Sequence, residues 1–195
     1  MIVSRFTPSS YALNRKDGQW VAQLDGATQS WVFDIPIQIT SDSEISLDLI
    51  LQRNTTQVIY GSGSSPERLY IGTENGNWLI GNGTDRIDTL IPAEIGIKNK
   101  TVLQASGGFL KFLVNDVVVY NQAIKYSTAK ILTGISDLSG FRLYGSVFNF
   151  SVKSSGVLVN QIPLTNKAQG ATQLATVGNV NAFMPNYTEA VWRKL

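Results

Sequence analysis

Apolar residues recur at every second position along most of this chain, and this period of two is the feature that most constrains its fold. The clearest runs cover residues 35–39, 45–51 and 110–114. Successive side chains of a β-strand point to opposite faces, so each run places one apolar face toward a core. Long amphipathic helices are not indicated. Tyr126–Ile135 has room for one or two helical turns, and Thr188–Lys194 for one.

Short segments rich in Gly, Asn and Ser separate these runs and predict turns. They are Ser41–Asp42, Gly61–Pro66, Asn75–Asn77, Gly81–Gly83 and Gly107–Gly108. Asn115–Asp116 and Ser155–Gly156 are expected to form tight hairpin turns. Many strands at this spacing predict an all-β fold, an antiparallel sandwich of two sheets.

The composition excludes several classes of chemistry. The chain has 195 residues, 43% of them hydrophobic, which suits one domain with a buried core. It has no Cys and no His, so disulfides, thiolate metal sites and Ser–His catalysis are excluded. The net charge is only +2 and the basic residues are scattered, so no nucleic-acid partner is expected.

The N-terminal residues form no basic segment followed by an apolar one, and no apolar run approaches the roughly 18 residues that span a membrane. We therefore expect neither a signal peptide nor a membrane partner, and synthesis in a cytoplasm. Residues 1–17 fit the strand pattern least. They are either an arm that docks on a neighbour or an edge strand of the domain formed by residues 18–195.

Four segments, taken in order, carry a family resemblance. They are Gln19–Trp31, Glu44–Leu51, Gly108–Asp116 and Gly140–Leu164. Together they resemble the laminin-G-like, or concanavalin A-like, lectin domains over roughly residues 18–165, although Asp116 replaces the customary Gly of one hairpin. The resemblance implies a jelly roll, that is, two stacked antiparallel sheets.

The C-terminal part extends the resemblance. Gln161–Asn166 and Asn186–Trp192 look like the tail of the versions carried by tailed-bacteriophage and prophage virion proteins. This implies a non-enzymatic virion structural protein on the tail, fibre or head, mediating subunit interaction, host-surface glycan binding, or both. The implied partners are other virion proteins, further copies of the chain and host surface polysaccharide. The implied location is the virion, made in the bacterial cytoplasm and released by lysis.

Two of these segments, Gly108–Asp116 and Gly140–Leu164, also supply core candidates. Phe112, Val147, Phe148 and Phe150 are expected in the core, although Phe148 must face away from Val147 unless a bulge intervenes. Gly145 lies inside a strand, where a side chain is usually preferred, and this predicts a bulge or a close backbone contact.

A sugar site needs an aromatic face for the ring and planar amides or carboxylates for the hydroxyls. Trp78 with Asn77, Asn82, Asp85 and Arg86 supplies both, and these five residues are the predicted ligand site. The alternative is that Trp78 shares a core-facing side of a strand with Ile80.

Relatives of this fold often hold calcium through loop oxygens, and the same loops contain Asn75, Asn77, Asn82, Asp85 and Asp88. Their spacing matches neither an EF-hand nor the Asp-x-x-x-Asn run of legume lectins. No metal and no other cofactor is therefore expected, with calcium as the alternative.

Catalysis by carboxylates was the remaining possibility. Glu44, Ser46 and Asp48 share one face of a strand, as catalytic residues do in sandwich glucanases. Glu44 and Asp48 are about 13 Å apart at the rise of a strand, too far for the pair that retaining hydrolysis needs. We read them as solvent-facing and expect no catalytic residue. A glycan-degrading enzyme and a purely architectural virion protein without a ligand remain the alternatives.

Overall fold

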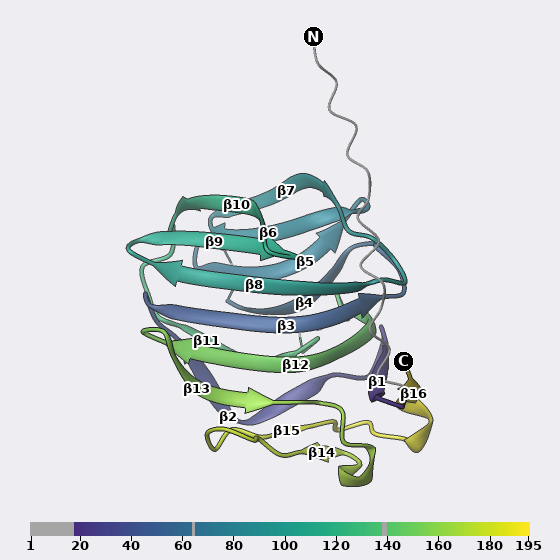
Figure 1. Cartoon of the computed structure of the whole chain (residues 1–195). Coiled ribbons are helices and arrows are strands. Elements are labelled where there is room, and N and C mark those ends of the chain that lie inside the picture. Colours follow the sequence, from purple (N-terminus) through teal and green to yellow (C-terminus); the bar gives the residue numbers. More distant parts are fainter. Residues whose placement is uncertain (1–17, 64, 138–139) are drawn as a thin grey trace.

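The computed structural model describes residues 18–63, 65–137 and 140–195. Two eight-stranded antiparallel sheets stack face to face in this part of the chain (Figure 1), so the predicted all-β sandwich is confirmed. The predicted N-terminal arm or edge strand, residues 1–17, lies outside the described residues.

The sheet nearer the viewer in Figure 1, called the front sheet, has the order β10-β9-β8-β3-β12-β1-β16, and β13 pairs with the second half of β12. Its strands are β10 Val117–Ala123, β9 Phe109–Val114, β8 Lys98–Ser106, β3 Ser43–Leu51, β12 Tyr144–Ser154, β1 Trp20–Asp25, β16 Trp192–Lys194 and β13 Val157–Ile162.

The other sheet, called the back sheet, has the order β14-β15-β2-β11-β4-β5-β6-β7. Its strands are β14 Thr172–Gln173, β15 Ala182–Phe183, β2 Trp31–Ile39, β11 Lys130–Ile135, β4 Gln57–Ser62, β5 Arg68–Glu74, β6 Asn77–Gly83 and β7 Asp85–Pro92. Two 3-10 helices, η1 Lys167–Gln169 and η2 Glu189–Val191, lie in the C-terminal segment. Within the described residues, no helix is long and apolar enough to span a bilayer.

Several predicted turns are confirmed. Both residues of the Asn115–Asp116 turn have positive φ, 49° and 65°, and so do Ser155 and Gly156. These are the dihedral angles of two-residue hairpin turns whose twist matches that of the strands.

Two expectations are wrong. Gly81–Gly83 ends strand β6 instead of forming a turn, and Tyr126–Ile135 contains β11 instead of helical turns. The single turn expected in Thr188–Lys194 is η2.

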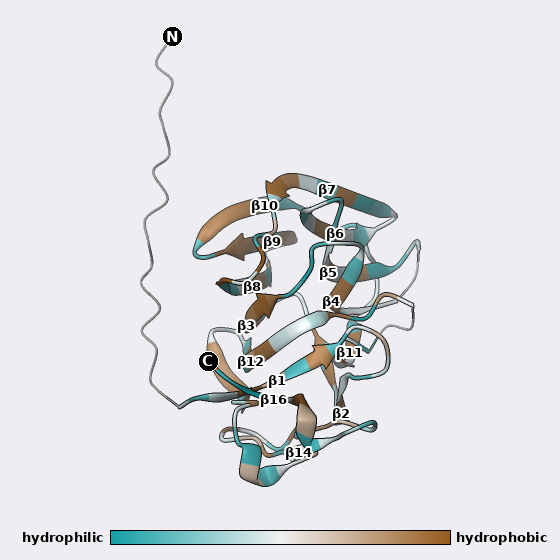
Figure 2. Ribbon diagram, turned by 90° about the vertical axis from the view of Figure 1, so that its right-hand side faces the viewer, coloured by the Kyte–Doolittle hydropathy of each residue, from teal (hydrophilic) through white to brown (hydrophobic). Residues whose placement is uncertain are grey.

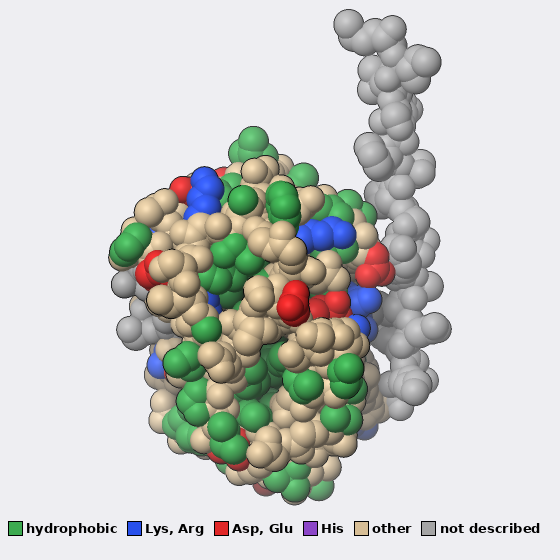
Figure 3. All heavy atoms as spheres, turned by 90° about the vertical axis from the view of Figure 1, so that its left-hand side faces the viewer, with side chains coloured by type: hydrophobic (Ala, Val, Ile, Leu, Met, Phe, Trp, Pro, Cys, Tyr) green, Lys and Arg blue, Asp and Glu red, His purple; other side chains and the backbone are tan. Residues whose placement is uncertain are grey.

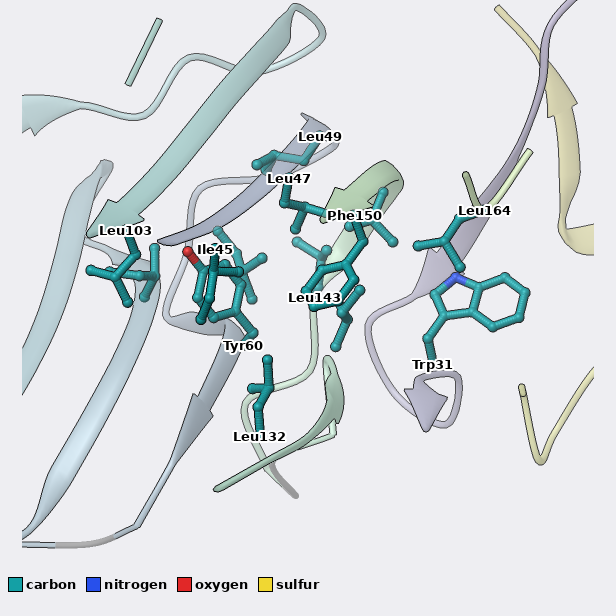
Figure 4. Packing of buried hydrophobic residues seen from close by; sticks show 14 of the residues in the cluster. Trp31, Ile45, Leu47, Leu49, Tyr60, Leu103, Leu132, Leu143, Phe150 and Leu164 are labelled. Carbon is teal, nitrogen blue, oxygen red and sulfur yellow. The ribbon is translucent and has the colours of Figure 1, made fainter. Parts of the chain in front are cut away.

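The apolar faces of the two sheets share one core. Figure 4 shows Ile45, Leu47 and Phe150 of the front sheet with Tyr60 and Leu132 of the back sheet in one cluster. Each fully buried side chain of this size contributes about 1.5–3 kcal/mol. At the end of the sandwich seen in Figure 3, hydrophobic side chains form the floor of a hollow at the centre of the face.

A bulge in β12 decides which faces its aromatic residues take. The pairing of β12 with β3 shifts between Phe148 and Ser151, and Asn149 has φ 54°. Val147 and Phe150 therefore both face the core, as does Phe112. Phe148 is also buried, but in a second cluster with Val21 and Ile50 on the outer side of the front sheet.

Gly145 makes the close backbone contact that its position predicted. It pairs with Leu24 on one side and Leu51 on the other. A Cβ at this position would lie 2.4 Å from the carbonyl oxygen of Ile50, which no real side chain allows.

A corner at Asp25 carries the chain from the front sheet to the back sheet. Asp25 Oδ1 accepts hydrogen bonds from the amides of Ala27, Thr28 and Gln29 at 2.9–3.0 Å, and Thr28 Oγ1 donates to Oδ2 at 2.7 Å. Burial raises the pKa of Asp25, but these bonds outweigh it and hold the pKa below its usual range. This corner fixes where β1 begins and ends in the front sheet.

Candidate functional site

Two of the five predicted ligand residues point into the core. Trp78 is 1% exposed and packs edge-to-face on Phe112, with ring centroids 5.7 Å apart. Asn82 is 0% exposed; its Nδ2 donates to Tyr120 Oη at 3.0 Å and to the Ala123 carbonyl at 2.9 Å. The prediction that Trp78 presents its ring to a sugar is therefore wrong, and the alternative, a core-facing Trp78 beside Ile80, is what the fold contains.

The other three residues are held by neighbouring side chains. Asn77 Nδ2 donates to Asp88 Oδ2 at 3.2 Å, Lys125 Nζ lies 2.5 Å from Asp85 Oδ2, and the Arg86 guanidinium forms a bidentate ion pair with Glu74. Hydrogen bonding by Lys125 lowers the pKa of Asp85. The five residues lie on adjacent strands β6 and β7, but they do not converge on one ligand.

The alternatives from the sequence are a calcium site and a pair of catalytic carboxylates. No group of three or more Asp and Glu side chains in the described residues is placed to hold a metal ion. Glu44 accepts from Lys153 Nζ at 2.7 Å and Gln104 Nε2 at 2.8 Å. Asp48 is 8% exposed, because Lys98 at 2.8 Å and Asn149 at 2.7 Å cover it; the expectation of a solvent-facing Asp48 is wrong.

An open pocket lies elsewhere, where β1 meets the C-terminal segment. Figure 2 shows this side of the molecule, with β1, β16 and the C-terminus together. The pocket has a volume of about 850 Å³. It is lined by Trp20, Thr165, Asn166, Lys167, Ala168, Gly170, Tyr187 and Glu189.

Trp20, the first residue of β1, lies at the margin of the core. It is partly exposed and packs against the buried cluster. Its cross-strand partner in β16 is Lys194, whose Nζ lies 5.4 Å from the centroid of the Trp20 ring. Lys167 Nζ, from η1, lies 4.1 Å from the same centroid. The ring thus faces two ammonium groups, an arrangement that the negative face of an indole favours.

Tyr187 forms a second aromatic wall of the pocket. It is partly exposed, and its hydroxyl accepts a hydrogen bond from Nε1 of the buried Trp192 at 3.2 Å. A Cβ added at Gly170, which has φ 61°, would lie 3.7 Å from the Tyr187 hydroxyl oxygen. The Tyr187 hydroxyl is therefore fixed, and still has a proton to donate to a ligand.

The buried side-chain amide of Gln173 holds the wall of the pocket that contains Asn166 and Gly170. Gln173 is 1% exposed; its Oε1 accepts from the Asn166 amide at 3.0 Å, and its Nε2 donates to the Asn166 carbonyl at 2.8 Å and the Gly170 carbonyl at 3.3 Å. The Asn166 side chain in turn caps η1 by accepting from the Ala168 amide at 3.1 Å. These bonds place Lys167 over Trp20 without help from a long regular element.

Sequence reasoning did not find this pocket. Trp20 and Lys167 are 147 positions apart, and the pairing of β1 with β16 brings the last residues of the chain to Trp20. The available signal was the family resemblance of Gln19–Trp31 and Asn186–Trp192, each of which carries an aromatic residue of this region.

No family model matches the sequence, and no curated protein does so either. Solved structures match its fold. A candidate carbohydrate-binding protein from Bacteroides ovatus has a TM-score of 0.69 at 11% identity, over 92% of this chain and 60% of that one. The heptameric SAP-like pentraxin of Limulus polyphemus has a TM-score of 0.51 at 14% identity, over 72% and 77% of the two chains.

The LG1-3 region of the laminin α2 chain has a TM-score of 0.54 at 12% identity, over 73% of this chain and 28% of that one. The chain thus spans less than two thirds of two of these three structures. At such identities the likeness concerns the fold alone. The fold of this chain is the lectin-type jelly roll of the concanavalin A-like and laminin-G-like domains.

Proposed function

We propose that this chain is a non-enzymatic glycan-binding module whose sugar site is the pocket between β1 and the C-terminal segment. The observation that carries the proposal is the pairing of two partly exposed aromatic rings, Trp20 and Tyr187, with polar groups in one open pocket. The fold it shares with a candidate carbohydrate-binding protein supports the same reading.

The chemistry of the pocket suits a sugar. A pyranose offers C–H groups for packing against an aromatic wall and hydroxyls that need donors and acceptors close by. Tyr187 Oη, the side-chain amide of Asn166 and the Glu189 carboxylate supply these around one open pocket. The cavity is large enough for two or three sugar units, since pockets of about 300–1,000 Å³ hold ligands of drug size.

The residues that line the pocket favour binding of a glycan over its hydrolysis. Glycoside hydrolysis uses two carboxyl groups about 5–9.5 Å apart. Glu189 is the one carboxylate among the residues that line the pocket. The sequence has no His to act as a general base in place of a second carboxylate. Release of reducing ends from a bound polysaccharide would favour the alternative, a glycan-degrading enzyme.

The finer proposal is a structural role on a tailed-bacteriophage virion, with host surface polysaccharide as the ligand and other virion proteins and further copies of the chain as partners. It is supported by the C-terminal resemblance, which covers residues that build the pocket: Thr165 and Asn166 in one segment, Tyr187 and Glu189 in the other. Many copies on one particle would raise a weak single-site affinity by avidity.

A glycan array tests the proposal. The full chain is presented as a multivalent conjugate to bacterial polysaccharides, beside Trp20→Ala and a control, Phe109→Ala. Phe109 is a 53% exposed aromatic residue of β9, which β8, β3 and β12 separate from β1. We expect Trp20→Ala to lose about tenfold or more in binding and the control to keep it. A flat array would refute the glycan-binding role and favour a purely architectural protein. Equal binding by all three proteins would refute the Trp20 pocket as the site.

A further inference from the structure

The two ammonium groups near the Trp20 ring indicate the charge of the ligand. Lys167 Nζ and Lys194 Nζ lie 4.1 and 5.4 Å from one ring centroid. No Asp or Glu in the described part of the chain forms an ion pair with either of them. Five other lysines in that part of the chain each have a carboxylate oxygen within 3.0 Å: Lys98, Lys100, Lys125, Lys130 and Lys153.

This arrangement has an electrostatic cost that an anion would remove. Two like charges held near one apolar ring repel each other, and the ring's quadrupole compensates each only in part, by about 0.5–2 kcal/mol. An anionic group in the pocket would gain a charge-assisted hydrogen bond to Lys167, which lines the pocket, and attraction from Lys194 beside the same ring. The site is therefore preorganised for a negative charge next to an aromatic wall.

The backbone fixes both lysines independently of a ligand. Lys194 is held opposite Trp20 by the register of β1 and β16, and the amide of Leu195 donates to the Gln19 carbonyl at 3.0 Å. Lys167 is held by the Gln173 clamp and by its own carbonyl, which accepts from the Gly170 amide at 3.0 Å. Because these contacts come from different parts of the chain, Lys167 and Lys194 meet at Trp20 only in the folded molecule.

We infer that the pocket selects anionic glycans, with the acidic group of one sugar bound by Lys167 and attracted by the nearby Lys194, and the sugar ring packed beside Trp20 and Tyr187. The inference rests on the proposed glycan-binding function and adds the ligand class. The charge of such a glycan comes from a uronic-acid carboxylate or from a phosphate group. Glu189 lies on the rim of the same pocket and opposes the bound charge.

The test compares polysaccharides that differ in charge alone. Binding of the full chain is measured by biolayer interferometry on polygalacturonate and its carboxyl-reduced form, and on phosphorylated dextran and dextran. We expect carboxyl reduction to weaken binding about fivefold or more, and a tenfold rise in salt, which shortens the screening length about threefold, to weaken it further. Stronger binding to phosphorylated dextran than to polygalacturonate would assign the charge to phosphate.

Substitutions that remove single charged side chains provide the second test. Lys167→Ala and Lys194→Ala should each weaken binding to the acidic polymer about two- to fivefold, and Glu189→Gln should strengthen it. Lys111→Ala, a lysine of β9 distant from the pocket, is the charge-matched control and should have no effect. Thermal unfolding of each variant distinguishes loss of binding from loss of folding.

The outcomes separate the two proposals. Equal, Trp20-dependent binding to the charged and neutral polymers would refute the anionic ligand and leave the glycan site standing. Binding that Lys111→Ala weakens as much as Lys167→Ala would also refute it, because the charge effect would then be non-specific. Failure to bind any polymer of the panel or of the glycan array would refute the glycan-binding function itself.

Discussion

Single residues decide the local geometry of this sandwich where the chain leaves no room for a side chain. Gly145 in the middle of β12 is the clearest case, because β3 lies against it so closely that a Cβ would meet the Ile50 carbonyl oxygen at 2.4 Å. At such a position a methyl group must displace backbone on a neighbouring strand.

We therefore predict that Gly145→Ala lowers the free energy of unfolding by about 1–3 kcal/mol, measured from the urea midpoint. The control is Gly156→Asn in the β12–β13 turn. This position has φ 79° and open space around it, which Asn tolerates, so its effect should stay within about 0.5 kcal/mol. Equal effects of the two changes would contradict the steric account.

Glu67 gives a residue-scale prediction about pH. Its carboxylate accepts from Lys130 Nζ at 2.6 Å, Ser127 Oγ at 2.8 Å and the Ser127 amide at 3.0 Å. Hydrogen bonds from Lys130 and then Ser127 lower the pKa of Glu67 to about 2. A carboxyl group whose pKa is lower in the folded chain stabilises it above its unfolded pKa, and this contribution is lost as the pH falls through the folded value.

The stability difference between the natural chain and Glu67→Gln should therefore be largest above about pH 4.5 and shrink as the pH falls toward 2. Urea unfolding of both proteins across this range measures it. A difference that does not change with pH would show that Glu67 contributes by packing or neutral hydrogen bonds only.

At the scale of elements, a short irregular segment builds one wall of the pocket. Residues 165–173 contain the single turn η1 and the two-residue strand β14, and the buried Gln173 amide satisfies backbone groups of Asn166 and Gly170. This one side chain thus holds residues 165–171, which are in no sheet.

Gln173→Ala should accordingly lower the free energy of unfolding by about 1–3 kcal/mol, because it leaves the Asn166 amide and carbonyl without their partners. It should also weaken glycan binding, although Gln173 does not line the pocket. The control Gln38→Ala, an exposed residue of β2, should change neither quantity. Unaltered binding by a folded Gln173→Ala protein would contradict a role for this clamp in positioning the wall.

For the molecule as a whole, the sequence predicts the architecture better than the site. Period-two patterning and paired turn residues such as Asn115–Asp116 specify strands and hairpins locally, and the fold follows from burying one face of each. The exceptions have local causes. The bulge at Asn149 brings Phe150 to the core side with Val147, which no alternation rule reveals.

The site could not be predicted in the same way. Alternation places Trp78 on a strand face but does not say which face is covered, and the fold covers it. The pocket joins Trp20 to residues near the other end of the chain, so it depends on the long-range pairing of β1 with β16. Short-range patterns contain no information about that pairing.

The four tryptophans provide the most direct test of the account, because Trp31, Trp78 and Trp192 are at most 3% exposed, whereas Trp20 lines the pocket. Their indole N–H signals in a ¹⁵N-labelled full chain would be assigned by single substitutions and followed during titration with oligosaccharides of uronic acids. We expect the Trp20 signal to move most and to saturate, with Trp31 and Trp78 unchanged. A titration in which Trp78 moves while Trp20 stays in place, or in which no indole signal responds, would contradict the central claim that the Trp20 pocket binds glycan.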